Sequence, residues 1–191
     1  MIALASHLET FFRDIFRFTL EHNASFFERT VQAHRLRLPA EQQLVEMGGS
    51  RFDYVAETLT LQSVSSIGDA FDPLFRPDSF RWAVENTQLV YAVPSRSAIG
   101  KGFPLAAFPE WWENLSQLFQ LRHELIHDAN STSVIERPVI ARLESLAILL
   151  PQYVALMVVP NGNEEVGEQE EALPAMLLVE DFLAKDRQIV G

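Results

Sequence analysis

Apolar side chains recur every three or four residues along most of this chain, and this spacing limits the folds that the chain can adopt. The first such series is Leu8, Phe11, Phe12, Ile15 and Phe16. Residues with this spacing lie on one face of an α-helix, because the helix makes one turn in about 3.6 residues. No alternation of apolar and polar residues is strong enough to predict a large sheet. The sequence therefore predicts an all-α fold.

Residues that begin and end helices divide the first third of the chain. Ser6 and Glu9 have the spacing of a capping box, and they predict the start of a helix that continues to about His22. The boundaries of three further helices are marked by Asn23, Pro39, Gly48, Gly49, Ser50 and Asp53. These residues predict four helical segments in the first third of the chain.

The middle of the chain is rich in proline. Residues 65–108 contain Pro73, Pro77, Pro94 and Pro104. Proline interrupts helices and is common in turns, so this part is expected to be a long irregular segment with one short helix over residues 78–85. Two longer helices are then expected over 109–128 and 138–159, each with a proline in its first turn. The fold expected is a helical bundle with a long irregular central segment.

The chain is expected to form one helical domain with a short appendage. A length of 191 residues and a hydrophobic content of 48% suit a single compact core, which we assign to residues 1–160. Residues 161–173 are rich in glutamate and predict a solvated acidic linker. Residues 174–191 include a short helix that can dock through Met176, Leu177 and Phe182.

Composition excludes several classes of protein. The chain has no cysteine, which removes disulfides, thiolate metal sites and cysteine nucleophiles and suits a reducing cytoplasm. Its first residues lack the basic region of a signal peptide, and its longest apolar run, 147–160, is shorter than a membrane span needs. A net charge of −11 argues against broad adhesion to nucleic acid, so any RNA contact must be local. We expect a cytoplasmic protein with no membrane segment and no DNA partner.

For function, the most informative stretch is RHELIH, residues 122–127, which fits two chemical patterns. The first is HExxH, in which His123 and His127 hold zinc and Glu124 is the base of a metallohydrolase. Because no histidine follows His127, the third ligand would be an acidic residue such as Glu136 or Glu144. A zinc-dependent peptidase is therefore one hypothesis.

The second pattern is RxxxxH, which pairs the guanidinium of Arg122 with the imidazole of His127. On a helix with about 100° per residue, Arg122 lies in the middle of the apolar stripe, whereas His123 and His127 lie on its polar flank. A bare guanidinium is costly to bury. Arg122 therefore needs a carboxylate of the same fold, the surface of a second subunit or an anionic ligand.

An arginine and a histidine together suit the cleavage of RNA. A neutral imidazole can take the proton of the 2′-hydroxyl while a fixed cation stabilises the charge that develops on the phosphate. One helix places Arg122 and His127 about 140° apart, so a single copy does not enclose a phosphate. A symmetric dimer would bring two such pairs into one cleft.

The sequence LFQLRHELIHD, residues 118–128, resembles the signature of HEPN domains, small all-helical proteins with an R-[N/D/H]-x-x-x-H motif. The order of helices over residues 3–159 is also similar. The resemblance implies a homodimeric, metal-independent endoribonuclease, or an RNA-binding relative, without a cofactor. It makes Arg122 and His127 the catalytic pair and His123 an auxiliary polar residue. Such proteins are often toxins of toxin–antitoxin or phage-defence systems, so a cognate antitoxin or defence protein is an expected partner.

Two further expectations concern partners. Arg96 and Lys101 in the central segment, and Arg137 after the motif, are the cations that we nominate for guiding RNA. A noncatalytic helical interaction module stays open as an alternative. In that module Arg122 is a clamp in the core or in a dimer interface, and an acidic face binds another protein.

Overall fold

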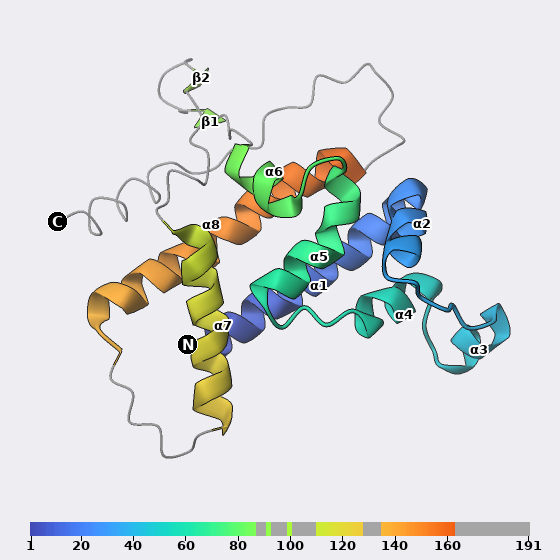
Figure 1. Ribbon diagram of the computed structural model, residues 1–191, viewed down its shortest axis with the longest axis horizontal. Coiled ribbons are helices and arrows are strands. Elements are labelled where there is room, and N and C mark those ends of the chain that lie inside the picture. Colours follow the sequence, from blue (N-terminus) through green and yellow to red (C-terminus); the bar gives the residue numbers. More distant parts are fainter. Residues whose placement is uncertain (87–90, 93–98, 101–109, 128–134, 163–191) are drawn as a thin grey trace.

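The computed structural model describes residues 1–86, 91–92, 99–100, 110–127 and 135–162. Its helices are α1 (Ile2–His22), α2 (Ala24–Ala33), α3 (Glu41–Glu46), α4 (Arg51–Thr58), α5 (Val64–Phe75), α6 (Phe80–Asn86), α7 (Trp111–His127) and α8 (Arg137–Gly162). Two short strands, β1 (Tyr91–Ala92) and β2 (Ile99–Gly100), pair antiparallel. Figure 1 shows helices packed on one another. Because a ladder of two residues per strand forms no layer of its own, the all-α prediction is confirmed.

The central helix of the fold is α1. It packs against α2, α4, α7 and α8, and Figure 1 shows it in blue, passing through the middle of the molecule. Its buried residues recur every three or four positions: Ala5, Leu8, Glu9, Phe12, Phe16, Thr19 and Leu20. The spacing read from the sequence is therefore that of a buried helix face. Glu9 is the one charged residue on this buried face of α1.

Aromatic rings join α1 to three other helices. The ring centroid of Phe71 on α5 lies 5.2 Å from that of Phe16 and 6.3 Å from that of Phe12. Phe80 on α6 lies 5.3 Å from Phe71, and Phe26 on α2 lies 5.6 Å from Phe16. Three of these four pairs meet edge to face, which the charge distribution of aromatic rings favours. This cluster is the part of the core that holds α1, α2, α5 and α6 together.

The helix boundaries confirm two of the capping predictions and correct a third. Asn23 caps α2, because its side chain accepts a hydrogen bond of 2.7 Å from the backbone N–H of Phe26. Ser50 caps α4 in a capping box with Asp53. The capping box predicted at Ser6 is wrong, because α1 begins at Ile2 and runs through Ser6. Residues 2–5 are apolar and contain two alanines, which extend the helix upstream of the serine.

The expectation of a long irregular central segment is wrong for its first part, which forms α5. Ser63 begins this helix in a capping box with Ser66. The residues of α5 that face the core are Val64, Ile67, Gly68, Ala70, Phe71, Pro73 and Leu74. Pro73 lies in the last turn, where its missing N–H costs the helix one backbone hydrogen bond near its end. The helix expected over 78–85 is confirmed as α6, and beyond Asn86 only the two strands of this segment belong to the described residues.

The last described helix, α8, is longer than the apolar run seen in the sequence. Its stretch Arg137–Val158 is long and apolar enough to cross a membrane by length and composition, with 39% of its most apolar window buried in the fold. Length alone therefore does not separate a membrane span from a core helix. The exposed face carries Glu144, Ile148 and Gln152, and the opposite face packs on α1 and α7. In this fold α8 therefore has one packed face and one exposed face.

The end of α8 lies close to the expected domain boundary at residue 160. The helix continues to Gly162. The rest of the acidic linker predicted over 161–173, and the whole docking helix predicted within 174–191, lie outside the described residues.

Candidate functional site

The RHELIH motif lies in the last turns of α7, at an end of the helix that extends past the other helices in the view of Figure 1. The first half of α7 is anchored by Trp111, Leu115 and Leu118, all of which are buried. On the helical wheel these three residues and Ile126 belong to the predicted apolar stripe. The prediction that this stripe is buried is confirmed for the three residues and wrong for Ile126, whose exposed fraction is 49%. A helical wheel gives the direction of a side chain but not the length over which a neighbouring helix covers it.

Arg122 finds its partner in a carboxylate on α1. Its Nη1 lies 3.1 Å from Oε2 of Glu9. The exposed fractions of the two side chains are 22% for Arg122 and 11% for Glu9. Of the three partners that the sequence left open, the described residues therefore supply the first, a carboxylate of the same fold. The pairing also explains why α1 can carry a glutamate on its buried face.

A second guanidinium contacts the same carboxylate. Nη2 of Arg13 lies 3.5 Å from Oε1 of Glu9, one turn away on α1. We call these three residues, Glu9, Arg13 and Arg122, the Glu9 cluster. Two guanidiniums and one carboxylate leave it with one formal positive charge. The Nε atoms of Arg13 and Arg122 are both buried, and neither has a hydrogen-bond partner in the described part of the chain.

The sequence reading missed Glu9 and Arg13 as part of this site. Glu9 was assigned to a capping box, and Arg13 was given no role. One signal was present, because Glu9 lies three residues before Phe12 and seven before Phe16 and so falls on the apolar face of its helix. A charge in that position requires a partner, but the sequence does not say which of the chain's arginines provides it.

The two histidines of the motif lie together on the exposed side of α7. The ring centroids of His123 and His127 are 4.4 Å apart, and the ring planes are tilted by 49°. Both side chains are exposed, as their place on the polar flank predicted. Neither imidazole makes a hydrogen bond to another described residue. Glu124 accepts a hydrogen bond of 2.9 Å from Gln120, along the helix rather than across it.

The zinc pattern lacks a third ligand in the described part of the chain. His123 and His127 are close enough to supply two ligands, since both lie on one flank of α7. No group of three histidine, aspartate or glutamate side chains that could hold a metal occurs among the described residues. Glu144, the third ligand that the sequence suggested, is an exposed residue of α8 and does not form such a group with the two histidines.

Of the three cations nominated for guiding RNA, one can be placed. Arg137 is the first residue of α8 and is exposed. Arg96 and Lys101 lie outside the described residues. The RNA contact that the sequence assigned to these two residues stays a prediction.

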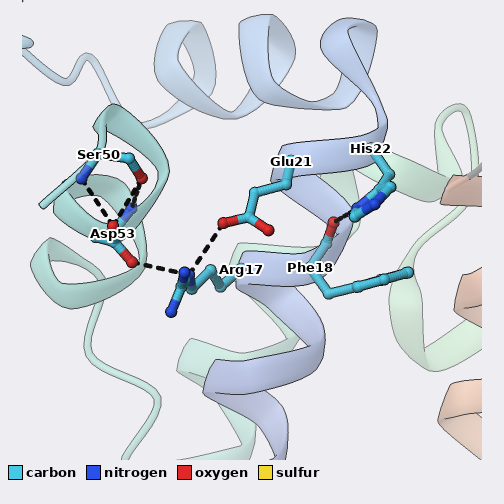
Figure 2. Close-up of polar contacts among 6 residues, drawn as sticks. All are labelled: Arg17, Phe18, Glu21, His22, Ser50 and Asp53. Atoms are coloured by element: carbon cyan, nitrogen blue, oxygen red, sulfur yellow. Dashed lines mark hydrogen bonds and ion pairs between the residues drawn. The ribbon is translucent and has the colours of Figure 1, made fainter.

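Another cluster on α1 has the opposite balance of charge. Nε of Arg17 lies 3.1 Å from Oε1 of Glu21 and 2.8 Å from Oδ1 of Asp53 on α4, as Figure 2 shows. The backbone N–H and the hydroxyl of Ser50 also donate to Asp53, each at 2.7 Å. The backbone hydrogen bond from Ser50, its hydroxyl and the Arg17 charge lower the pKa of Asp53 below its ordinary value. This cluster ties α1 to α4 and carries no excess of positive charge.

Comparisons with known proteins add no relative. No protein-family model matches the chain, and no curated protein or solved structure gives a significant match. The HEPN resemblance thus rests on the residues of the motif and on the order of the helices.

Proposed function

We propose that this chain is a HEPN-like, metal-independent endoribonuclease that acts as a homodimer. One observation carries the proposal. The end of α7 presents two exposed imidazoles, His123 and His127, next to an arginine whose guanidinium is already held in place by Glu9. An imidazole that takes a proton and a fixed cation that stabilises the phosphate charge are groups suited to cleavage of RNA by its own 2′-hydroxyl.

Each residue of the motif has a distinct role in this proposal. His127, as a neutral imidazole, takes the proton of the 2′-hydroxyl, whose oxygen then attacks the adjacent phosphorus. Arg122 stabilises the negative charge on the phosphoryl oxygens. The 5′-oxygen of the next nucleotide leaves with a proton from the second His127 of the dimer. The products are a 2′,3′-cyclic phosphate and a 5′-hydroxyl, and no metal takes part.

Two features support a dimer at the end of α7. Arg122 and His127 point about 140° apart on their helix, so two copies are needed to place both residue types around one phosphate. Ile126 between them is 49% exposed and offers apolar surface to a second copy. The cellular setting proposed is a cytoplasmic toxin–antitoxin or phage-defence system. There a cognate antitoxin or defence protein would cover the same surface.

Cleavage of a labelled RNA by the purified protein tests the proposal. His127→Ala should abolish cleavage, and His123→Ala should weaken it. Arg122→Lys, which keeps a positive charge opposite Glu9, should lose most of the activity because a lysine lacks the planar fork of donors. His22→Ala, another exposed histidine, is the matched control and should cleave normally. Cleavage that survives His127→Ala, or that EDTA removes, would rule out the proposed chemistry.

The ion pair between Arg122 and Glu9 favours a second candidate function. A noncatalytic interaction module needs Arg122 only as a clamp between α7 and α1, and the observed contact of 3.1 Å is such a clamp. An acidic face of the protein would then bind a partner protein. In this case Arg122→Lys and His127→Ala would leave the biological effect unchanged, whereas Arg122→Ala would destabilise the fold. A zinc peptidase has less support, since the described residues offer only two ligands close together.

A further inference from the structure

The ion pairs of the described residues form three clusters that differ in their balance of charge. In two of them, one arginine contacts two carboxylates. Arg17 lies between Glu21 and Asp53 (Figure 2), and Arg81 contacts two further glutamates, Glu85 at 2.8 Å and Glu113 at 3.5 Å. The positive charge of each arginine is therefore more than neutralised. Neither cluster has an electrostatic reason to bind an anion.

In the Glu9 cluster the ratio is reversed, with two arginines on one carboxylate. Among the described residues, one formal positive charge stays without a counterion there, in a protein whose net charge is −11. A guanidinium has five N–H donors, and Glu9 contacts one nitrogen of each arginine. The cluster thus has an excess positive charge and unused N–H donors. An anion would neutralise the charge and accept hydrogen bonds from the donors.

The cluster is open to a ligand on the arginine side. The exposed fractions of the side chains are 42% for Arg13 and 22% for Arg122, whereas Glu9 beneath them is 11% exposed. The carboxylate therefore holds the two guanidiniums from below, and their outer parts face solvent. Guanidinium groups bind phosphate through pairs of parallel hydrogen bonds, so two of them held in this way suit a phosphate group.

We propose that the Glu9 cluster binds a phosphate group of RNA and that Arg13 is a phosphate-binding residue together with Arg122. The choice of RNA as the source of the phosphate rests on the proposed function, whereas the preference for an anion rests on the cluster itself. Glu9 has two effects in this site. It orients both guanidiniums before the ligand arrives, and its negative charge opposes the ligand.

Binding of an RNA that cannot be cut tests this inference separately from cleavage. The probe is a single-stranded oligonucleotide with 2′-O-methyl groups, which lacks the attacking hydroxyl. Arg13→Gln should raise the Kd about tenfold, the effect of losing one charged hydrogen bond. It should also reduce the slope of log Kd against log salt by about 0.7, which corresponds to one phosphate contact on a single strand. Arg17→Gln and Arg81→Gln are the matched controls and should leave both quantities unchanged.

Glu9→Gln provides a second variant that does not remove a cation. It raises the formal charge of the Glu9 cluster from +1 to +2, so the oligonucleotide should bind several-fold more tightly. Inorganic phosphate should compete with the oligonucleotide for wild-type protein. If the protein binds inorganic phosphate but does not bind the oligonucleotide, RNA is not the ligand of this site.

The outcomes separate the binding site from the proposed cleavage. Equal binding by wild type and Arg13→Gln, or equal weakening by the Arg17 and Arg81 controls, would overturn the site whatever the cleavage assay gives. Weaker binding by Glu9→Gln would contradict the assigned effect of the carboxylate charge. Binding that depends on Arg13 in a protein that cleaves no RNA would support the site and overturn the proposed nuclease.

Discussion

Replacing Arg122 with alanine should destabilise the protein by about 2 kcal/mol, a value that follows from the burial of its partner. Breaking a fully buried ion pair costs about 3–5 kcal/mol, because it leaves an uncompensated charge. Breaking an exposed pair costs about 0–1 kcal/mol. With exposed fractions of 22% and 11%, the pair of Arg122 and Glu9 lies between these limits. Arg13 stays 3.5 Å from Glu9 in the variant and compensates part of the loss.

Thermal and urea unfolding measure this effect. A loss of about 2 kcal/mol lowers the folding equilibrium constant about 30-fold and lowers Tm by about 4–8 °C for a domain of this size. Arg17→Ala is the control, since this arginine is 50% exposed and should cost less than about 1 kcal/mol. A double-mutant cycle with Glu9→Ala should give a coupling of about 1–2 kcal/mol. If Arg122→Ala costs no more than Arg17→Ala and the coupling is near zero, the clamp does not exist in solution.

Two further predictions concern the fold. Asp53→Ala should cost about 1 kcal/mol at neutral pH, because the carboxylate no longer accepts hydrogen bonds from the backbone N–H and the hydroxyl of Ser50 and no longer contacts Arg17. The folded pKa of Asp53 lies below its ordinary value of 3.8, so its stabilisation is present above about pH 4 and is lost as the pH falls further. Urea unfolding of wild type and variant should therefore converge at low pH, and a constant difference would contradict the assignment. Phe71→Ala should cost about 3–5 kcal/mol, because its ring is fully buried against Phe12, Phe16 and Phe80. A cost below about 1 kcal/mol in the same assay would mean that these rings do not form the core.

Local sequence signals were sufficient for most of the helices. The end of α1 at His22 and the caps at Asn23 and Ser50 follow from hydrogen bonds within four residues of each other, which a sequence specifies directly. The missed helix, α5, shows where such signals conflict. Pro73 suggested an irregular segment, whereas the capping serine Ser63 and the apolar spacing of residues 64–74, which the prediction did not use, favour a helix. The spacing prevailed because burial of a whole face outweighs one missing backbone donor near the end of a helix.

Some features of the candidate site could likewise be predicted from local sequence signals, and others could not. Its position at the end of α7, the exposure of His123 and His127 and the need of Arg122 for a partner all follow from the helical wheel and the cost of burying a charge. The identity of that partner cannot be predicted in this way, because Glu9 is far from Arg122 in the sequence and lies beside α7 only through the packing of α1 against α7.

The amino-acid sequence by itself determined the all-helical class, most helix boundaries and the residue types at the end of α7. These properties depend on contacts between residues a few positions apart. Only the tertiary structure decided that one carboxylate on α1 holds two arginines and that none of the other described helices covers the last turn of α7. Both depend on which helix faces which and over what length, and the periodicity of a single helix contains no information about either.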